Sequence, residues 1–215
     1  MKGFAAVAAL ALVAGCVSIA IGNEPAAHAH LSLRDAGAPA AHRAAPLVDA
    51  LLVQPLPGDA LADTLAIAYS RRADEYAFYQ LASWAERPVR QLPRLLQRRL
   101  EARGVARAVG LVGDPLRADW LLAVSIDELH HDVSSLPGEA RFALTADLFD
   151  RRTRTRLARE RFASSVPTPT ADSSAAAHAL SIAVSQAFDA LVPWLEDNLQ
   201  RVAADLPVRN GQGAH

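Results

Sequence analysis

The residues whose types could support acid–base or metal chemistry gather at His130-His131-Asp132. Two adjacent histidines on a β-strand point to opposite faces of the sheet, so they cannot easily hold one metal ion together. The chain carries no Gly-x-Ser-x-Gly elbow, no phosphate-binding loop and no His-Glu-x-x-His motif. We therefore interpret the cluster as an exposed strand end, and we predict no catalytic residue, no metal site, no cofactor and no enzymatic activity.

The other residue with defined chemistry is Cys16, the only cysteine in the 215-residue sequence. It follows a positive charge at Lys2, an apolar run over residues 4–13 and two small residues. This order is typical of a secretory signal, and the run is too short to span a membrane. Residues 12–16 resemble the lipobox of bacterial lipoproteins, which implies cleavage before Cys16 and lipid on its thiol. The alternative is an ordinary signal peptide that happens to contain a cysteine.

The predicted organisation is a lipoprotein signal peptide over residues 1–15, a lipidated tether over 16–29, one domain over 30–206 and a flexible tail over 207–215. Residue 17 is Val, whereas Asp at that position is the usual signal for retention in the inner membrane. We therefore expect the chain to be anchored through Cys16 to the periplasmic face of the outer membrane. The formal net charge of -1 gives no electrostatic case for binding nucleic acid.

The hydrophobic pattern predicts an α+β domain, an antiparallel sheet with two helices packed on one face. Strands are predicted over 47–53, 64–70, 76–80, 120–129, 142–148 and, exposed and rich in arginine, over 154–164. The first helix should begin near residue 90 and end at Gly104, and the second should begin near residue 172 and be kinked or divided at Pro193. The arginines at positions 90, 94, 98 and 99 are interpreted as a solvated helix face, with a phosphate site as the alternative.

Five of the twelve aromatic residues fall within sixteen positions, at Tyr69, Tyr76, Phe78, Tyr79 and Trp84. Tyrosine and tryptophan are enriched where a protein surface meets a partner. Because Tyr76 and Phe78 share one strand face, Tyr79 must point to the other. We predict partner binding through Tyr69, Tyr76, Tyr79 and Trp84. The alternative is that the cluster packs the sheet against the first helix, an arrangement we favour for Phe78 and Trp84.

The same region carries a family resemblance. Ile67-Ala68-Tyr69, Asp74-Glu75-Tyr76 and Trp84-Ala85-Glu86, with Pro88 just before the helix, resemble the ABC-type transport auxiliary lipoprotein family and its PqiC-like branch of intermembrane transport lipoproteins. The resemblance covers most of residues 30–205. It implies a non-enzymatic accessory of an MCE-type ABC system, which moves lipids or other apolar molecules between the inner and outer membranes.

The partners implied by this resemblance are an MCE-domain protein and an ABC permease with its ATPase. A homo-oligomer is possible, because a protein that docks onto a ring-shaped partner could itself form a ring. Two other functions stay open at this point. One is a structural or assembly lipoprotein of the outer membrane or the cell-wall machinery, and the other is a periplasmic enzyme built around His130, His131 and Asp132.

Overall fold

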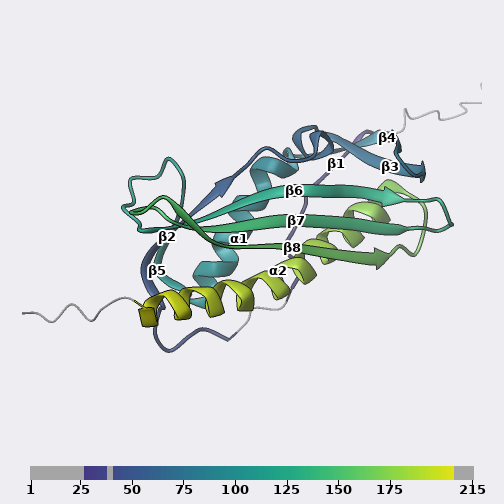
Figure 1. Cartoon of the computed structure of the whole chain (residues 1–215). Coiled ribbons are helices and arrows are strands. Elements are labelled where there is room, and N and C mark those ends of the chain that lie inside the picture. The colour runs from purple at the N-terminus through teal and green to yellow at the C-terminus, as the bar shows by residue number, and fades with distance from the viewer. Residues whose placement is uncertain (1–26, 38–40, 206–215) are drawn as a thin grey trace, which may run out of the picture.

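The computed structural model describes residues 27–37 and 41–205, which form one α+β domain (Figure 1). The predicted signal peptide, Cys16 and the tail over 207–215 lie outside these described residues. The strands are β1 (Ala29–Leu31), β2 (Val48–Pro55), β3 (Ala66–Arg72), β4 (Glu75–Trp84), β5 (Ala106–Leu111), β6 (Trp120–Asp132), β7 (Glu139–Asp150) and β8 (Thr155–Pro167). The helices are α1 (Pro88–Arg103) and α2 (Ser173–Asp205), with a short 3-10 turn at Ala60–Asp63.

The sheet is organised around its long strand β6. On one side of β6 run β7 and β8, both antiparallel to their neighbours. The other side is shared, because β2 pairs in parallel with residues 120–124 of β6 and β3 pairs in parallel with residues 131–132. Strand β5 extends the first of these two ends, and β4 followed by β1 extends the second. Strand β6 is therefore the spine of the sheet, to which every other strand is paired directly or through its neighbours. Different strands flank the two ends of this spine, β2 and β5 at one end and β3, β4 and β1 at the other.

The sheet is mixed, so the predicted purely antiparallel arrangement is wrong. Parallel pairs need a long crossover between the two strands. The chain provides these crossovers through α1, between β4 and β5, and through the β3–β4 hairpin. Strand β5 was not predicted, because its Ala-Arg-Ala-Val-Gly-Leu sequence lacks the alternation of a half-buried strand.

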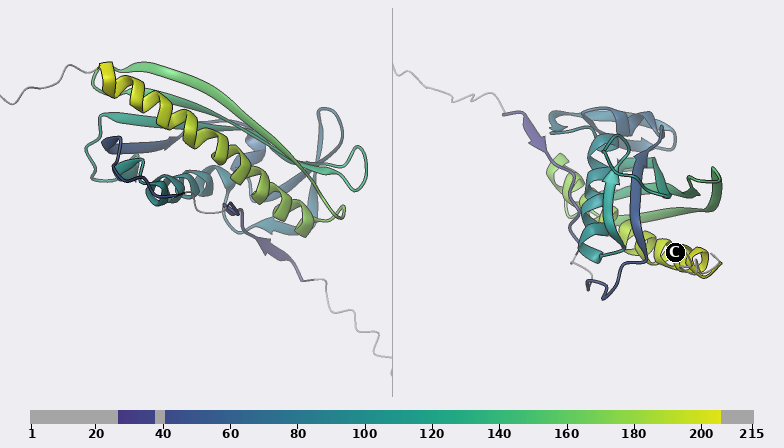
Figure 2. Two further views of the ribbon diagram at one scale, coloured as in Figure 1. Left: turned by 90° about the horizontal axis from the view of Figure 1, so that it is seen from below. Right: turned by 90° about the vertical axis from the view of Figure 1, so that its left-hand side faces the viewer.

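Both helices cover the same face of the sheet, as predicted, with α1 over β2 and β5 and α2 over β7 and β8 (Figure 2). The core between the layers contains side chains from every layer, among them Leu96, Leu122, Phe142, Leu144 and Phe188. Helix α1 ends at Arg103 and is capped by Gly104, as predicted, in the left-handed conformation with φ 72°.

Helix α2 is one continuous helix through Pro193, so of the two predicted outcomes, a kink or a division into two helices, the division is wrong. Pro193 is on the exposed side of the helix, where carbonyl groups that lose a hydrogen bond can turn toward water. By length and composition, residues 173–202 could cross a membrane, but 67% of their apolar window is buried in the domain. This helix is therefore a core helix.

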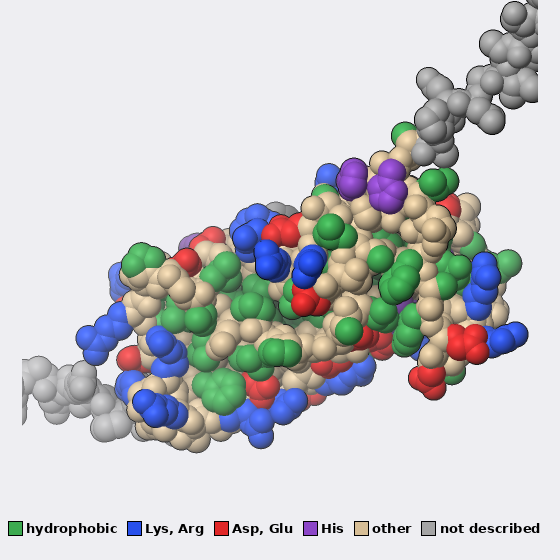
Figure 3. Space-filling view, turned by 90° about the horizontal axis from the view of Figure 1, so that it is seen from above, with side chains coloured by type: hydrophobic (Ala, Val, Ile, Leu, Met, Phe, Trp, Pro, Cys, Tyr) green, Lys and Arg blue, Asp and Glu red, His purple; other side chains and the backbone are tan. Residues whose placement is uncertain are grey.

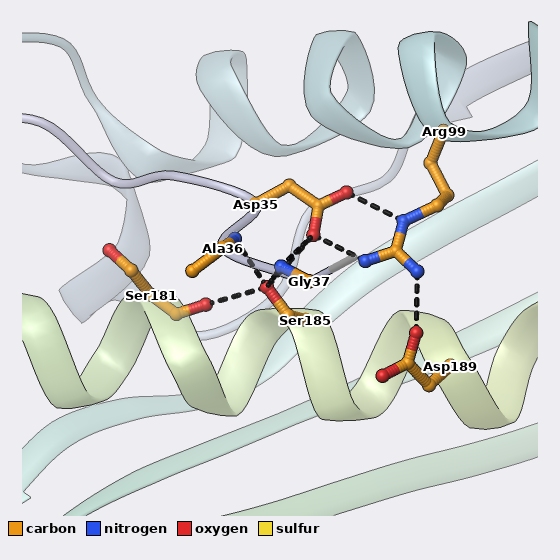
Figure 4. A network of polar contacts seen from close by, with 7 residues as sticks. All are labelled: Asp35, Ala36, Gly37, Arg99, Ser181, Ser185 and Asp189. Carbon is orange, nitrogen blue, oxygen red and sulfur yellow. Dashed lines mark hydrogen bonds and ion pairs between the residues drawn. The ribbon is translucent and has the colours of Figure 1, made fainter. Parts of the chain in front are cut away.

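An ion cluster centred on the buried Arg99 joins the segment after β1 to both helices (Figure 4). Arg99 of α1 donates from Nε to Asp35 at 2.7 Å and from Nη1 to Asp189 of α2 at 2.5 Å. Ser185 of α2 donates to Asp35 at 2.8 Å and accepts from the backbone N–H of Ala36 at 2.6 Å. Arg99 is 7% exposed, which corrects its assignment to a solvated face.

The hydrogen bonds of this cluster set the charge of Asp35. Burial acts to raise the pKa of Asp35, but the hydrogen bonds from Arg99 and Ser185 outweigh it and hold the pKa below its usual value. Gly37 is needed beside the cluster, since a Cβ there would lie 2.3 Å from a guanidinium nitrogen of Arg99. The cluster is therefore an ionised unit with no room for a larger residue at position 37.

A second contact continues this connection. Arg103 of α1 donates from Nε to Glu196 of α2 at 2.7 Å and also contacts the carbonyl oxygen of Ala41. Arg43 lies 3.3 Å from the same glutamate. Two arginines one helical turn apart thus fix the incoming chain, on both sides of residues 38–40, to the pair of helices.

We predict that Arg99→Met lowers the free energy of unfolding by about 3 kcal/mol, because it leaves the carboxylate of Asp35 without its buried partner. Arg98→Met is the matched control, since Arg98 is exposed on the next position of the same helix, and it should change stability by less than about 0.5 kcal/mol. Urea unfolding measures both. Equal effects of the two substitutions would contradict a structural role for the cluster.

Candidate functional site

The predicted aromatic cluster forms a surface at the β3–β4 hairpin and the neighbouring β6–β7 turn. We call it the aromatic surface and define it as Tyr69, Tyr76, Phe78, Tyr79 and Leu136. Tyr76 is 45% exposed, Phe78 40% and Leu136 77%. A cluster of exposed apolar side chains of this kind is typical of an interaction site.

The hairpin presents aromatic rings on both of its faces. Tyr76 packs edge-on against His130, with ring centroids 5.2 Å apart, whereas Tyr79 stacks on His131 at 6.3 Å. The prediction that Tyr76 and Tyr79 point to opposite sides is confirmed. The expectation that Phe78 packs in the core is wrong, because its ring is 40% exposed on the strand face that also carries Tyr76, where Phe78 pairs with Ala68.

Trp84 lies elsewhere. Its side chain is 2% exposed and belongs to the core beneath α1, as the alternative interpretation expected. A partner cannot reach this ring in the folded domain. The prediction that Trp84 binds a partner is therefore wrong, whereas binding through Tyr69, Tyr76 and Tyr79 stays a prediction.

The two histidines are buried, so their assignment to an exposed strand end is wrong. His130 is 6% exposed and His131 is 0% exposed. A bulge in β6 between Ile126 and Glu128 reverses the alternation and turns His131 toward the helices, whereas His130 on the other face packs against the ring of Tyr76. No alternation rule applied to the sequence would have located this bulge.

His131 links the aromatic surface to the β6–β7 turn. Tyr79 Oη lies 2.7 Å from His131 Nδ1, and His131 Nε2 lies 3.0 Å from Thr168 Oγ1. Because the Thr168 hydroxyl donates to backbone carbonyls of the turn, His131 must donate from Nε2 and accept from Tyr79 at Nδ1. Both nitrogens of a neutral imidazole are thereby used, so His131 supports the position of Tyr79.

Burial is the main cause of the pKa shifts of Tyr79 and of both histidines. It lowers the pKa of His131 and raises the pKa of Tyr79 to about 12. On the other face of the sheet, burial also lowers the pKa of His130, whose Nδ1 lies 3.8 Å from Glu128 and has no hydrogen-bond partner among the described residues. Both histidines are therefore neutral at pH 7.

A groove runs beside these rings. Its cavity volume is ≈ 650 Å³, and Arg71 lies over one of its rings, with the guanidinium carbon 5.2 Å from the centroid of Tyr69. The groove is lined by Tyr69, Arg71, Phe78, Tyr79, Gln80, Val133, Ser134, Leu136 and Ala171. In the part of the chain that the structure describes, no three metal-ligating side chains come together. The groove is equipped for apolar and aromatic contact.

The aromatic surface lies at the end of the sheet where the chain enters the domain. Strand β1 pairs with residues 82–84 of β4, the hairpin strand that carries Tyr76, Phe78 and Tyr79. Figure 1 places β1, β3 and β4 together at this end, while the β7–β8 turn lies at the other. A partner on the aromatic surface would therefore contact the domain beside its N-terminal segment.

We predict that the domain loses stability as the pH falls below about 6.5. A histidine whose pKa is lowered by folding takes up a proton more readily in the unfolded chain, so stability is complete above the unfolded pKa and declines below it. The decline is at most about 1.4 kcal/mol per pH unit for each histidine. Urea unfolding between pH 7.5 and 5.0 should show it, with a shallower slope for His131→Gln. An equal slope in the variant would contradict the burial of a neutral His131.

This chain is similar to known proteins in both sequence and fold. A family model for the ABC-type transport auxiliary lipoprotein component matches residues 31–192. Protein XCC0632 from Xanthomonas campestris has a similar structure, with TM-score 0.72 and 24% identity, over 81% of this chain and 98% of that one. An uncharacterised protein of known structure matches with TM-score 0.58 and 12% identity, over 78% and 99% of the two chains. No curated protein matches this chain.

The family match extends from β1 into α2 and so includes the aromatic surface, the groove and the buried Arg99 cluster. The structural matches, at this low identity, bear on the fold alone. The matched family is a transport component and not a family of known enzymes. This chain belongs to the ABC-type transport auxiliary lipoprotein family.

Proposed function

We propose that this protein is the membrane-anchored periplasmic accessory of an MCE-type ABC transport system. Such a system moves lipids or other apolar molecules between the inner and outer membranes. The family match over residues 31–192 carries the proposal. The aromatic surface supports it, because it offers apolar contact area and no arrangement of groups suited to catalysis.

Anchoring follows from Cys16, with the signal peptide over residues 1–15 removed. Two or more acyl chains hold a protein on a membrane firmly, whereas one holds it marginally. Val17 favours the outer membrane over the inner one. The tether of thirteen residues (17–29) can span at most about 45 Å, so the domain stays near its membrane.

The partner in this proposal is the MCE-domain protein, which docks on the aromatic surface. Tyr76 and Phe78 contribute ring area on one side of the hairpin, and Tyr69 and Tyr79 line the groove with Leu136. The hydrogen bond from Tyr79 to His131 and the cation–π contact of Arg71 hold two of these rings in place. Rings that are already fixed lose little conformational freedom on binding.

Docking can be tested with Phe78→Ser combined with Leu136→Ser. Loss of two exposed apolar anchors should reduce co-purification of the MCE-domain protein at least tenfold, since anchor residues each contribute more than about 1 kcal/mol. Val112→Ser with Leu157→Ser is the matched control, because both residues are also exposed, at 49% and 38%, and lie outside the groove. Unchanged recovery with the groove variant, or recovery of a cell-wall synthase and no MCE-domain protein, would contradict the proposal.

The anchor has its own test. Cys16→Ala should give a protein that is released from membranes, unfolds at the same urea concentration as the wild type and fails to restore function in a deletion strain. The core lies within residues 29–202, so loss of the lipid does not affect folding. Full complementation by the released form would show that attachment is incidental.

A further inference from the structure

A second concave site lies at the opposite end of the sheet from the aromatic surface. We call it the distal pocket. Its cavity volume is ≈ 660 Å³, within the range of small-molecule sites. It is bounded by the end of β2, the β5–β6 connection and the β7–β8 turn, and it is lined by Gln54, Leu56, Arg117, Ala118, Asp119, Leu121, Ala123, Phe149, Asp150, Arg151, Arg152 and Arg154.

The floor of the distal pocket is apolar. Leu121 of β6 and Phe149 of β7 are paired across the sheet, on the face that the helices do not cover, and Ala123 continues the row. Leu56 completes the floor, where its backbone N–H donates to the carbonyl oxygen of Val124 at 2.7 Å. Leu56, Leu121 and Phe149 are only partly buried, so an apolar ligand could remove further surface from water.

The rim of the distal pocket is basic. Arg117, Arg151 and Arg154 form no ion pair with any described residue, although Arg151 donates to the carbonyl oxygen of Ala118 at 2.8 Å. Arg152 is different, because it pairs with Asp150 at 2.9 Å and lies over the ring of Trp120. The lining contains four arginines and two aspartates, Asp119 and Asp150, so its formal charge is +2. In Figure 3, blue side chains border green ones at the end far from the N-terminal segment.

The arginines of the neighbouring strand show what is unusual about this rim. Arg156 and Arg159 of β8 both lie near Asp147, at 3.4 and 3.8 Å. Arg161 lies 3.6 Å from both Asp127 and Glu128. Acidic residues on the exposed face of the sheet therefore pair with the arginines of β8, whereas three of the four arginines around the apolar floor, all but Arg152, have no such partner among the described residues.

Arg154 has a backbone conformation that favours glycine. Its φ is 58°, in the left-handed region, which glycine adopts freely and arginine adopts at a cost in stability. The turn itself is held by Asp150, whose Oδ1 accepts from the backbone N–H of Arg152 at 2.8 Å. The side chain of Arg154 is therefore not needed to form the turn, and strain of this kind often accompanies a binding role.

We propose that the distal pocket binds an anionic amphiphile. Its carboxylate or phosphate head would lie among Arg117, Arg151 and Arg154, whose planar groups suit both kinds of head. Its apolar chain would cover Leu121, Phe149 and Leu56. This inference deepens the proposed transport function by naming the charge of a ligand, but the pocket shares no residue with the aromatic surface.

The test is a calorimetric titration of the purified chain from Val17 onward, which retains every core residue. Dodecyl phosphate and laurate, both below their micelle concentrations, should bind one per chain. Dodecyl maltoside, which has the same chain and a neutral head, and inorganic phosphate, which has no chain, should each bind at least tenfold more weakly. Equal binding of the maltoside would overturn the need for charge, and equal binding of inorganic phosphate would overturn the need for the apolar floor.

Variants locate the binding. The double variant Arg117→Glu, Arg154→Glu should weaken the binding of dodecyl phosphate at least tenfold. The control is Arg90→Glu with Arg98→Glu on the exposed side of α1, which makes the same change of charge and should leave the affinity within twofold of the wild type. Arg154→Gly separates binding from folding. It should raise the melting temperature by about 2–4 °C, because glycine relieves the backbone strain, and it should still weaken binding of the ligand.

Equal affinity in the wild type and in the Arg117→Glu, Arg154→Glu variant would overturn the proposal. The titration contains no transport partner, so its failure would leave docking on the aromatic surface unaffected. Loss of that docking would equally leave the distal pocket untouched.

Discussion

The contacts of Arg99 join the segment after β1 to both helices, and contacts of Arg103 and Ser185 strengthen this connection. One guanidinium group on α1 contacts Asp35 in the segment after β1 and Asp189 on α2. The two helices cover different halves of the sheet and make few other contacts with each other. A planar group with five donors can satisfy two carboxylates at once, which a lysine at this position could not do with the same geometry. The position of the incoming chain relative to the core therefore depends on this residue together with Ser185 and Arg103.

That connection matters because the chain leading to the predicted anchor enters the domain through β1. A short strand of three residues at the sheet edge would hold the domain weakly by itself. Asp35, Ala36 and Gly37 lie a few residues after this strand and bind to Arg99 and Ser185, so a force on the predicted tether would pass into both helices. In the proposed function this gives the aromatic surface, beside β1, a fixed orientation toward the membrane.

The spine strand β6 separates two kinds of surface. Its thirteen residues span about 43 Å, with aromatic and aliphatic side chains exposed near its end and unpaired arginines around its beginning. The two ends differ because different strands flank them, β3 and β4 at one and β2 and β5 at the other. One end can contact a protein while the other holds a small anionic ligand, with no competition for the same residues.

Much of this could be predicted from local pattern. Period-two alternation identified β6 and β7, and the apolar stripes identified both helices, with Gly104 ending the first. The parallel pairings could not be predicted, because they depend on which strands meet across the crossovers. The burial of Arg99 could have been predicted, since positions 92, 95, 96, 99 and 100 form one helical stripe that places Arg99 among buried leucines. No sequence signal indicated the burial of His131, because this burial follows from a bulge in β6.

The most direct test of the account is site-specific photo-crosslinking in cells. A photoreactive phenylalanine analogue at position 78 places the reactive group on the aromatic surface without removing an aromatic ring, and the same analogue at position 157 serves as the control on β8. The account predicts a crosslinked product between position 78 and the MCE-domain protein, and none from position 157. Crosslinks from position 78 to other envelope proteins, with none to an MCE-domain protein, would contradict it.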